Sequence, residues 1–589
     1  MAGHIVREQT DRFLDEITRH APWEVWAEKL AARKRPEPLH KLIPTKNECP
    51  LEWSLSDATP PNTRELLEWL YHLRRRPKKD ESHDWTEVIN RWLEATHGQA
   101  TVKKQLTTET MVEMLAWGHS LPRLASRCLP EVWSALLGTL LNTAADAINA
   151  PGGEVKLDQL WSSQLLACEL PLTLAYQFPK MEVCEQLLRP ARRRLEESLI
   201  GLLDGEGVLH GRYAEAWRGL LACWTRCMYL DRKLTGDRIS KDARLQFEWM
   251  VRQSIRWCRG DGTLVLTNDT TTIFEMLETA VAVGGDRVDR DLWAVHRGRR
   301  KESSSAYALP SAGEHSEWAE QAILRSSWSG ESTYLAFNFS QNRCVAELNS
   351  HGTLLWHGAL LPTIRFNGTP LKLNNQWDEI CWESNDEVDY LELETELGHG
   401  WTLQRQVMLA RDDNFIWFAD ALLGSHDGKI EYELELPLST QVQCVEEAET
   451  TEIQLLSPRP QGWAMPVALS EWKTDRRAGQ FTGRELRQEA NGSALYCPIF
   501  FDLDPERRRK QRTWRQLTVA EELNLMPADV AVAYRVQVGD EQWIFYRSLG
   551  ETGNRTFIGQ NLISEFYAAR FNTDGDVEEL IEIETQDDD

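Results

Sequence analysis

The chain has 589 residues, with 66 Lys or Arg and 91 Asp or Glu, so its formal net charge at pH 7 is −25. A field of this sign disfavours a nucleic-acid backbone as the main partner. The hydrophobic fraction of 42 % and the charged fraction of 27 % are ordinary for a globular protein, which excludes a disordered, collagen-like or coiled-coil chain as a whole. We therefore expect several folded domains and no nucleic-acid partner.

Export and membrane signals are weak in this sequence. Closely spaced charges from Arg7 to Arg19 leave no apolar core for a signal peptide. The most apolar stretch, residues 135–145, falls short of the roughly 18 apolar residues that span a membrane. We expect a cytoplasmic protein without a membrane partner.

Eleven scattered cysteines, an odd number, suit reduced thiols better than a disulfide framework. Cys223 and Cys227 lie four residues apart, but no second ligand pair completes a metal motif around them. The sequence favours packed thiols and implies neither a metal nor another cofactor.

The first half of the chain has the three- and four-residue spacing of amphipathic helices, clearest over residues 109–147. Trp161 with Leu165-Leu166-Ala167-Cys168 recurs as Trp217 with Leu220-Leu221-Ala222-Cys223, and the Asp-Gly turns at Asp204 and Asp261 lie 57 residues apart. A period near 55 residues with two helices per unit indicates stacked helical hairpins, which form either an open solenoid or a closed α/α toroid. Because the tryptophans follow the period, we expect Trp161 and Trp217 to be buried at equivalent positions.

The hydrophobic period changes from 3.6 to 2 after a segment rich in Arg, Lys, Ser, Pro and Gly between Arg297 and Glu317. Alternating stretches such as residues 333–339, 390–394 and 430–436 predict strands with one wet face, as in an antiparallel sandwich. We expect a helical hairpin-repeat domain over residues 1–300, a linker over 301–320, a large antiparallel β-sandwich over 321–575 and an acidic tail over 576–589.

Two features together resemble a known family. A helical repeat domain precedes a predicted sandwich that opens with Ile323-Leu324-Arg325-Ser326-Ser327-Trp328, contains Arg405-Gln406-Val407-Met408-Leu409-Ala410-Arg411-Asp412-Asp413-Asn414-Phe415 and continues with Ala419-Asp420. This combination resembles the heparinase II/III-like polysaccharide lyases, and the likeness is specific over residues 322–424. It implies an α/α toroid joined to a β-sandwich, with β-elimination of uronate-containing polysaccharides in the cleft between them.

The resemblance also predicts which residue types the chemistry requires. Removing the C5 proton beside a carboxylate requires Asn, His or Arg to neutralise that carboxylate, and Tyr or His as base and acid. The family's histidine pair is missing here, because the corresponding strand has Asn342, Arg343 and Glu347 instead. We therefore expect a divergent member that binds an acidic polysaccharide or oligosaccharide in the cleft, with weak or no lyase activity. The alternative is an active lyase on uronate-containing glycans.

Candidate site residues follow from this chemistry. His210, Tyr213 and His351 are the candidate catalytic groups, and the residues that could bind substrate are Arg212, Asn268, Asn342, Arg343, His357 and Arg405. His210, Arg212 and Tyr213 follow a repeated turn, where a helix N-terminus is expected. A hydrolase using Asp204 and Glu206 as paired carboxylates is a third alternative, weakened because the repeat at Asp261 has no second carboxylate.

Overall fold

The computed structural model describes residues 19, 22–33, 39, 43, 49–73, 83–101, 106–150, 157–374, 376–475, 478–572 and 575–584. The chain divides into two compact units. Unit 1 comprises Met1–Cys258 and Gly262–Ala294, and unit 2 comprises Arg259–Asp261 and Val295–Asp589. The division therefore falls at residue 294, and the short turn 259–261 belongs with unit 2.

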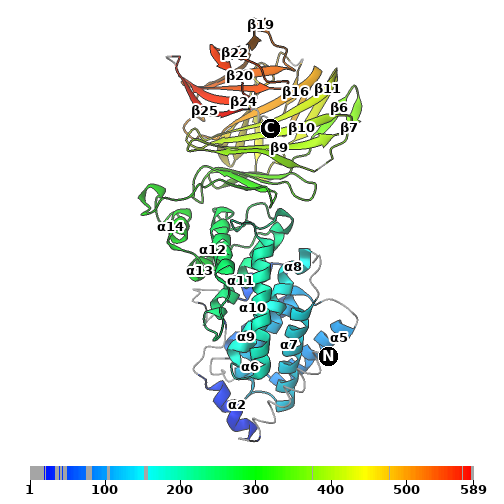
Figure 1. Cartoon of the computed structure of the whole chain (residues 1–589), viewed down its shortest axis with the longest axis vertical. Coiled ribbons are helices and arrows are strands. Elements are labelled where there is room, and N and C mark those ends of the chain that lie inside the picture. The colour runs from blue at the N-terminus through cyan, green and yellow to red at the C-terminus, as the bar shows by residue number, and fades with distance from the viewer. Residues whose placement is uncertain are drawn as a thin grey trace. The chain divides into compact units, whose positions relative to one another are not determined.

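Unit 1 is helical, as the period of 3.6 predicts, and its helices are coloured blue to green in Figure 1. Its elements are α2 (Trp23–Ala31), η1 (Glu52–Ser54), α4 (Pro61–His72), α5 (Trp85–Thr101), α6 (Thr108–Leu124), α7 (Pro130–Asn149), α8 (Leu157–Gln164), the π-helix η2 (Leu165–Glu169), α9 (Leu170–Gln177), α10 (Glu182–Leu202), η3 (Gly211–Ala216), α11 (Trp217–Asp231), α12 (Lys241–Arg256), α13 (Phe274–Val283) and α14 (Arg287–His296), whose last two residues belong to unit 2. Helix α10 packs against α7, α9 and α12, and α11 packs against α8 and α13. Side-chain caps begin α6, where Thr107 accepts from the Thr110 amide, and α12, where Ser240 accepts from the Ala243 amide.

The repeated turns have matching conformations at the predicted period of about 55 residues. Antiparallel bridges join Leu203 to Leu209 and Cys258 to Leu264. The glycines with positive φ in these turns are Gly207 and Gly262, at 82° and 92°. Bridges and glycines thus repeat after 55 residues, whereas the Asp-Gly pairs lie 57 apart. Gly207 also has no room for a side chain, since an added Cβ would lie 2.5 Å from the Met250 amide nitrogen.

Unit 2 consists of antiparallel sheets, as the period of 2 predicts. After η4 (Glu302–Ser304), the first sheet has the order β1-β2-β3-β4-β5, with bounds Glu314–Ser316, Gln321–Arg325, Tyr334–Asn338, Val345–Ser350 and Thr353–Ala359. The second sheet has the main order β12 (Gln443–Glu446), β13 (Ile453–Ser457), β14 (Arg459–Pro466), β16 (Glu485–Asp502), β11 (Phe415–Glu435), β10 (Trp401–Ala410), β9 (Val388–Leu397) and β8 (Asp378–Ser384), with β6 (Thr363–Phe366), β7 (Thr369–Leu371) and β15 (Gly479–Phe481) beside it.

Two further sheets complete unit 2. The third is β17 (Arg512–Leu517), β20 (Ala531–Val538), β21 (Glu541–Ser548), β24 (Phe566–Phe571) and β25 (Val577–Ile583), and the fourth is β19 (Asn524–Leu525), β18 (Ala520–Glu521), β22 (Arg555–Phe557) and β23 (Gln560–Leu562). One core joins the first sheet to the second, a second core joins the second to the third, and a third joins the third to the fourth. The second sheet is therefore buried on both faces, so the sandwich has four layers (Figure 1).

Two expected boundaries differ from the structure. Part of the expected linker is ordered into η4 and β1. Within the expected acidic tail, Val577–Ile583 forms β25 and pairs with β24, because Leu580, Ile581 and Ile583 enter the core, the adjacent Leu580 and Ile581 doing so at an irregularity in the strand pairing. Residues 585–589 of that tail lie outside the described residues.

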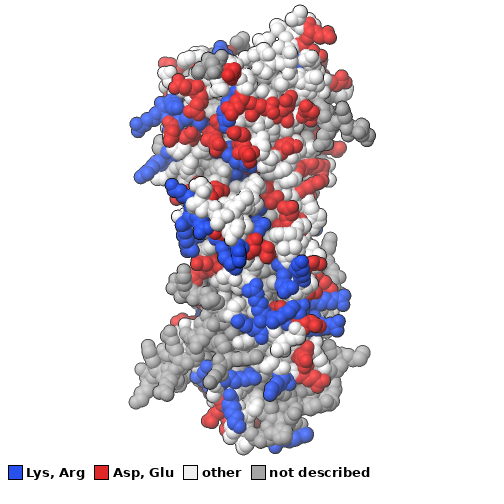
Figure 2. Space-filling model, turned by 60° about the vertical axis from the view of Figure 1, so that its left-hand side comes forward, with Lys and Arg blue, Asp and Glu red and all other residues white. Residues whose placement is uncertain are grey.

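Charge is unevenly distributed over the surface. Figure 2 shows basic and acidic side chains gathered in separate patches on the face that it displays. Salt screens a field over about 8 Å at physiological ionic strength. A local cluster of arginines can therefore still receive an anion, despite the net charge of −25.

The two repeat tryptophans have different environments. Trp217 is 3 % exposed, and its Nε1 donates to Ser254 Oγ at 2.9 Å. Trp161 is half-buried, and its indole ring lies against Gly219, where an added Cβ would come within 2.4 Å of the ring. The two residues thus both belong to the packing around α11, but only Trp217 is fully within the core.

We predict that Trp217→Ala lowers the free energy of unfolding by about 3 to 5 kcal/mol, because it leaves a cavity and removes a buried hydrogen bond. Urea denaturation followed by far-ultraviolet circular dichroism measures this loss. Trp318→Ala, at a side chain that is 50 % exposed, is the control and should change it little. An unchanged denaturation midpoint for Trp217→Ala would contradict its assignment to the core.

Candidate functional site

In unit 1 the structure brings together His210, Arg212 and Tyr213. His210 caps η3, since its Nδ1 accepts from the Arg212 amide at 3.3 Å, and its carbonyl accepts from the Tyr213 amide at 2.8 Å. The Arg212 guanidinium lies 5.3 Å from the centre of the Tyr213 ring. Burial and the neighbouring Arg212 charge lower the His210 pKa to about 4. At neutral pH this group therefore offers an exposed cation, a phenol and an uncharged imidazole.

Asn268 is exposed in the segment that follows the second repeated turn. The next residue, Asp269, is ion-paired with Arg218 in the first turn of α11. Arg218 also donates to the Leu55 carbonyl at 2.9 Å, which fixes this segment to the rest of unit 1. We call His210, Arg212 and Tyr213 the His210 group. Because η3 runs directly into α11, the Asn268 segment contacts the same end of α11 that the His210 group precedes.

In unit 2 a buried polar cluster surrounds Glu347 in the middle of β4. The Arg259 guanidinium donates to both Glu347 oxygens at 2.7 Å. The Tyr334 hydroxyl on β3 donates to Oε1 at 2.7 Å, and His357 Nδ1 on β5 lies 2.9 Å from Oε2. Strand register explains the geometry, since Glu347 pairs directly with His357 across β4 and β5. We call Arg259, Tyr334, Glu347 and His357 the Glu347 cluster.

The electrostatics of the Glu347 cluster favour an ionised carboxylate. Glu347 is completely buried, which by itself raises its pKa, but the hydrogen bonds from Arg259 and His357 and the Arg259 charge lower it to about 2. Burial and the Glu347 charge raise the Tyr334 pKa well above its usual value, so its hydroxyl remains protonated at neutral pH. The cluster thus holds its anion firmly and offers no phenolate.

The other predicted residues of unit 2 lie apart from the Glu347 cluster. Asn342 and Arg343 are exposed in the turn before β4. His351 is exposed in the turn after β4, where Asn414 Nδ2 lies 3.1 Å from its Nε2, and burial of its ring lowers its pKa. Asn342 and Arg343 therefore lie before β4 and His351 lies after it, whereas His357 lies beside the middle of β4.

Arg405 lies in the core of the sandwich and is completely buried. It pairs directly with Asp420 across β10 and β11, with both guanidinium–carboxylate distances at 2.8 Å, and it donates to the Leu360 carbonyl at 2.8 Å. Its environment is that of a structural ion pair, with no donor directed to the surface of the sandwich among its contacts with the described residues.

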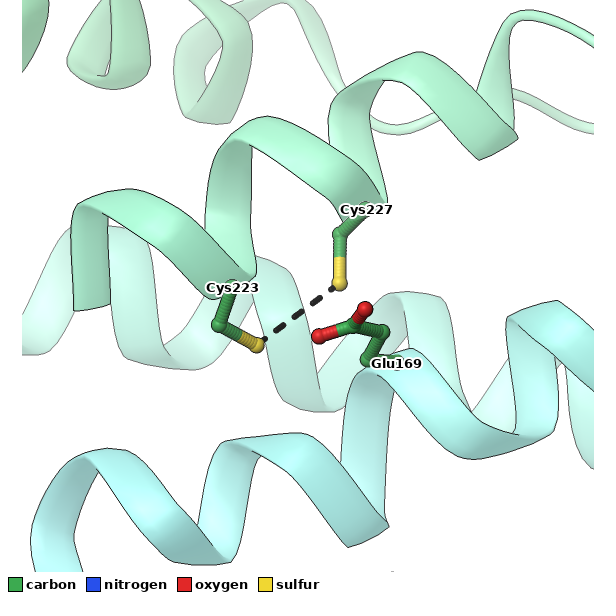
Figure 3. A group of neighbouring side chains, drawn as sticks. All are labelled: Glu169, Cys223 and Cys227. Atoms are coloured by element: carbon green, nitrogen blue, oxygen red, sulfur yellow. Dashed lines mark hydrogen bonds between the residues drawn. The ribbon is translucent and has the colours of Figure 1, made fainter. Parts of the chain in front are cut away.

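Glu169, Cys223 and Cys227 converge within unit 1, and Figure 3 shows the two thiols of α11 facing the carboxylate at the end of η2. Arg226 occupies both Glu169 oxygens, at 2.6 and 2.8 Å. Burial raises the Cys227 pKa to about 11 and the Cys223 pKa well above its usual value. The thiols are therefore protonated at neutral pH, and the carboxylate is already neutralised, which fits a packed core better than a metal centre.

Comparisons with known proteins agree with the observed architecture. No family model and no curated protein sequence matches the chain. Among solved structures, heparinase III has a TM-score of 0.55 at 11 % identity, with 92 % of this chain and 98 % of that chain covered. A heparan sulfate lyase, HepC, from Pedobacter heparinus has a TM-score of 0.52 at 12 % identity, with 90 % of this chain and 94 % of that chain covered.

The chain has the heparinase III fold. This likeness confirms the predicted class, an α/α toroid of helical hairpins followed by a large antiparallel β-sandwich. None of the described helices is long and apolar enough to cross a membrane. The heparinase III fold gives the architecture, and the chemistry must be argued from this chain's own residues.

Sequence reasoning missed three members of the Glu347 cluster. Arg259 contacts Glu347 across 88 residues of sequence, and periodicity within either segment gives no sign of this contact. For Tyr334 and Glu347 the sequence carried only a weak signal, namely a polar group on a predicted strand. The structure shows that both positions are buried. A buried carboxylate requires partners, and that requirement predicts a cluster without identifying its members.

We predict that Glu347→Gln lowers the free energy of unfolding at pH 7 by about 3 to 5 kcal/mol, because it removes the carboxylate that neutralises the largely buried Arg259 guanidinium. Since the Glu347 pKa is lowered, from 4.5 to about 2, its stabilisation is complete above about pH 4.5 and is lost as the pH falls through 2. Urea denaturation between pH 2 and 7 should show this loss in the natural protein and a flatter profile in the variant.

Glu435→Gln is the matched control, since Glu435 forms an exposed pair with Arg484, and such pairs contribute little. A Glu347→Gln protein as stable as this control, with an unchanged acid profile, would contradict the assigned role of the cluster.

Proposed function

We propose that the chain binds an acidic, uronate-containing saccharide and cleaves it weakly or not at all. The observation that carries this proposal is the saturation of the Glu347 cluster by its own carboxylate. Arg, Tyr and His are the residue types that would neutralise a uronate carboxylate and move its C5 proton. Here one internal carboxylate already engages all three side chains.

Binding is assigned to exposed groups. In unit 1, Arg212 supplies a cation, Tyr213 a ring face and hydroxyl, and Asn268 an uncharged amide. Such a set can pair with a sugar carboxylate, contact the apolar side of a pyranose and hydrogen-bond to hydroxyls. The low pKa of His210 keeps its imidazole neutral, so it contributes hydrogen bonding to this group. In unit 2, exposed Arg343 and Asn342 provide a second set of this kind.

Weak elimination follows from the protonation states. A general base near its working pH typically contributes about 10² to 10⁴ in rate. Tyr334 remains a phenol, and its hydroxyl is committed to Glu347. Arg259 donates from Nε and Nη2 to the same carboxylate. These bonds to Glu347 compete with any that the two side chains could make to a uronate.

An active lyase is the second candidate, and His357 favours it. Glu347 holds the ring through Nδ1, and enzymes orient an imidazole base through one nitrogen so that the other can accept a proton. The His357 side chain is 21 % exposed. An oriented, partly exposed histidine is the strongest candidate base in the described part of unit 2.

We predict that heparan sulfate, alginate or hyaluronan oligosaccharides bind the protein and that Arg212→Gln weakens this binding about tenfold, because one charge-assisted hydrogen bond is lost. Isothermal titration calorimetry measures the affinities. Arg244→Gln, at an exposed arginine on α12, is the control and should leave the affinity unchanged. Equal affinity for both variants would contradict the assignment of Arg212.

In the same incubations we predict little growth of the ultraviolet absorbance of unsaturated uronate, since Glu347 already engages the Tyr334 hydroxyl and the Arg259 guanidinium. Robust product formation that disappears in His357→Ala would establish the second candidate instead. Loss of that product in Tyr213→Phe or His351→Ala would place the reacting groups at those residues.

A further inference from the structure

Unit 1 contains a cavity of about 240 Å³ that is separate from the His210 group. Its walls come from the end of α9, the first half of α10 and the segment between α11 and α12. Ligand sites for drug-sized molecules usually measure about 300 to 1,000 Å³. This cavity is therefore matched to a smaller ligand, of the size of a single sugar ring.

A buried arginine forms one wall of the cavity. Arg192 on α10 has a side chain that is 7 % exposed, and its Nε donates to Asp231 Oδ1 at 2.7 Å. Its Nη2 is buried and has no hydrogen-bond partner. An unpartnered buried donor is costly, because the group has lost its water without a replacement. A ligand oxygen in the cavity would supply the missing acceptor.

The charges around Arg192 are of both signs. Arg189 and Lys233 add two exposed cations, and Glu185 and Asp237 add two carboxylates. A bare oxyanion would meet repulsion from those carboxylates, whereas a hydroxylated anion would use both kinds of group. Its anionic group would pair with the cations, and its hydroxyls would donate to the carboxylates.

We propose that this cavity binds a monosaccharide that has one anionic group, with Arg189, Arg192 and Lys233 receiving the anion and Glu185 and Asp237 receiving hydroxyls. This site does not depend on the proposed binding of a polymer, because none of its residues belongs to the His210 group or to the Glu347 cluster. The anionic group can be a phosphate, a sulfate or a carboxylate, which share the acceptor oxygens that the guanidinium groups require.

Isothermal titration calorimetry of the full chain tests the proposal with four probes, namely glucose 6-phosphate, glucose 6-sulfate, glucuronate and inorganic phosphate, and with glucose as the neutral comparison. At least one acidic sugar should bind saturably and more tightly than both inorganic phosphate and glucose. The double variant Arg189→Gln with Lys233→Gln should weaken that binding at least tenfold. Both positions are exposed, so a circular dichroism melt should show an unchanged fold.

Two controls distinguish this site from others. Arg193→Gln removes the adjacent arginine of α10, which is exposed and paired with Glu197, and should leave the affinity unchanged. Arg244→Gln, at an exposed arginine of α12 that belongs to neither proposed site, should also leave it unchanged. The proposal would be overturned by equal binding in the double variant, or by binding of inorganic phosphate as tight as that of every acidic sugar. It would also be overturned if no acidic sugar bound saturably.

Discussion

The Glu347 carboxylate is the constraint on which the chemistry of unit 2 depends. A buried anion is stable only when charge and hydrogen bonds replace the water that it has lost. Arg259, Tyr334 and His357 provide this replacement from a turn and two neighbouring strands. The same bonds hold β3, β4 and β5 in register and attach the turn 259–261 to the first sheet. Removing the anion would leave three polar groups without their partner.

This constraint also limits what the chain can do as an enzyme. In this chain a protein carboxylate, Glu347, already engages the Arg, Tyr and His side chains around it. Hydrogen bonds and the Arg259 charge lower the pKa of Glu347, whereas burial and the Glu347 charge raise the pKa of Tyr334, so Tyr334 stays protonated and cannot act as a base. In the proposed function, affinity for an acidic sugar and turnover of that sugar are therefore separate properties, because the exposed Arg212 and Asn268 and the half-buried Tyr213 do not belong to the Glu347 cluster.

Local patterns predicted the architecture better than the site. The change of hydrophobic period separated helices from strands, because burial of one face imposes it residue by residue. β25 was missed, because its apolar residues Leu580, Ile581 and Ile583 break the period of 2 and stand among glutamates in an acidic segment. Arg405 was expected at a ligand, although the short turn after β10 places it opposite Asp420 on β11. Arg259 could not have been predicted, since its contact with Glu347 is set by tertiary packing and by no local period.

Saturation-transfer difference NMR on a uronate oligosaccharide incubated with the protein tests the central claim most directly, because one spectrum reports both binding and elimination. Transfer from protein to sugar protons measures contact, and growth of the vinyl proton of an unsaturated uronate measures product. We predict clear transfer with no growth of the vinyl signal beyond the rate without protein. Vinyl growth at an enzymatic rate, or the absence of transfer for every uronate oligosaccharide, would contradict the account of a glycan-binding protein whose own carboxylate occupies its reactive groups.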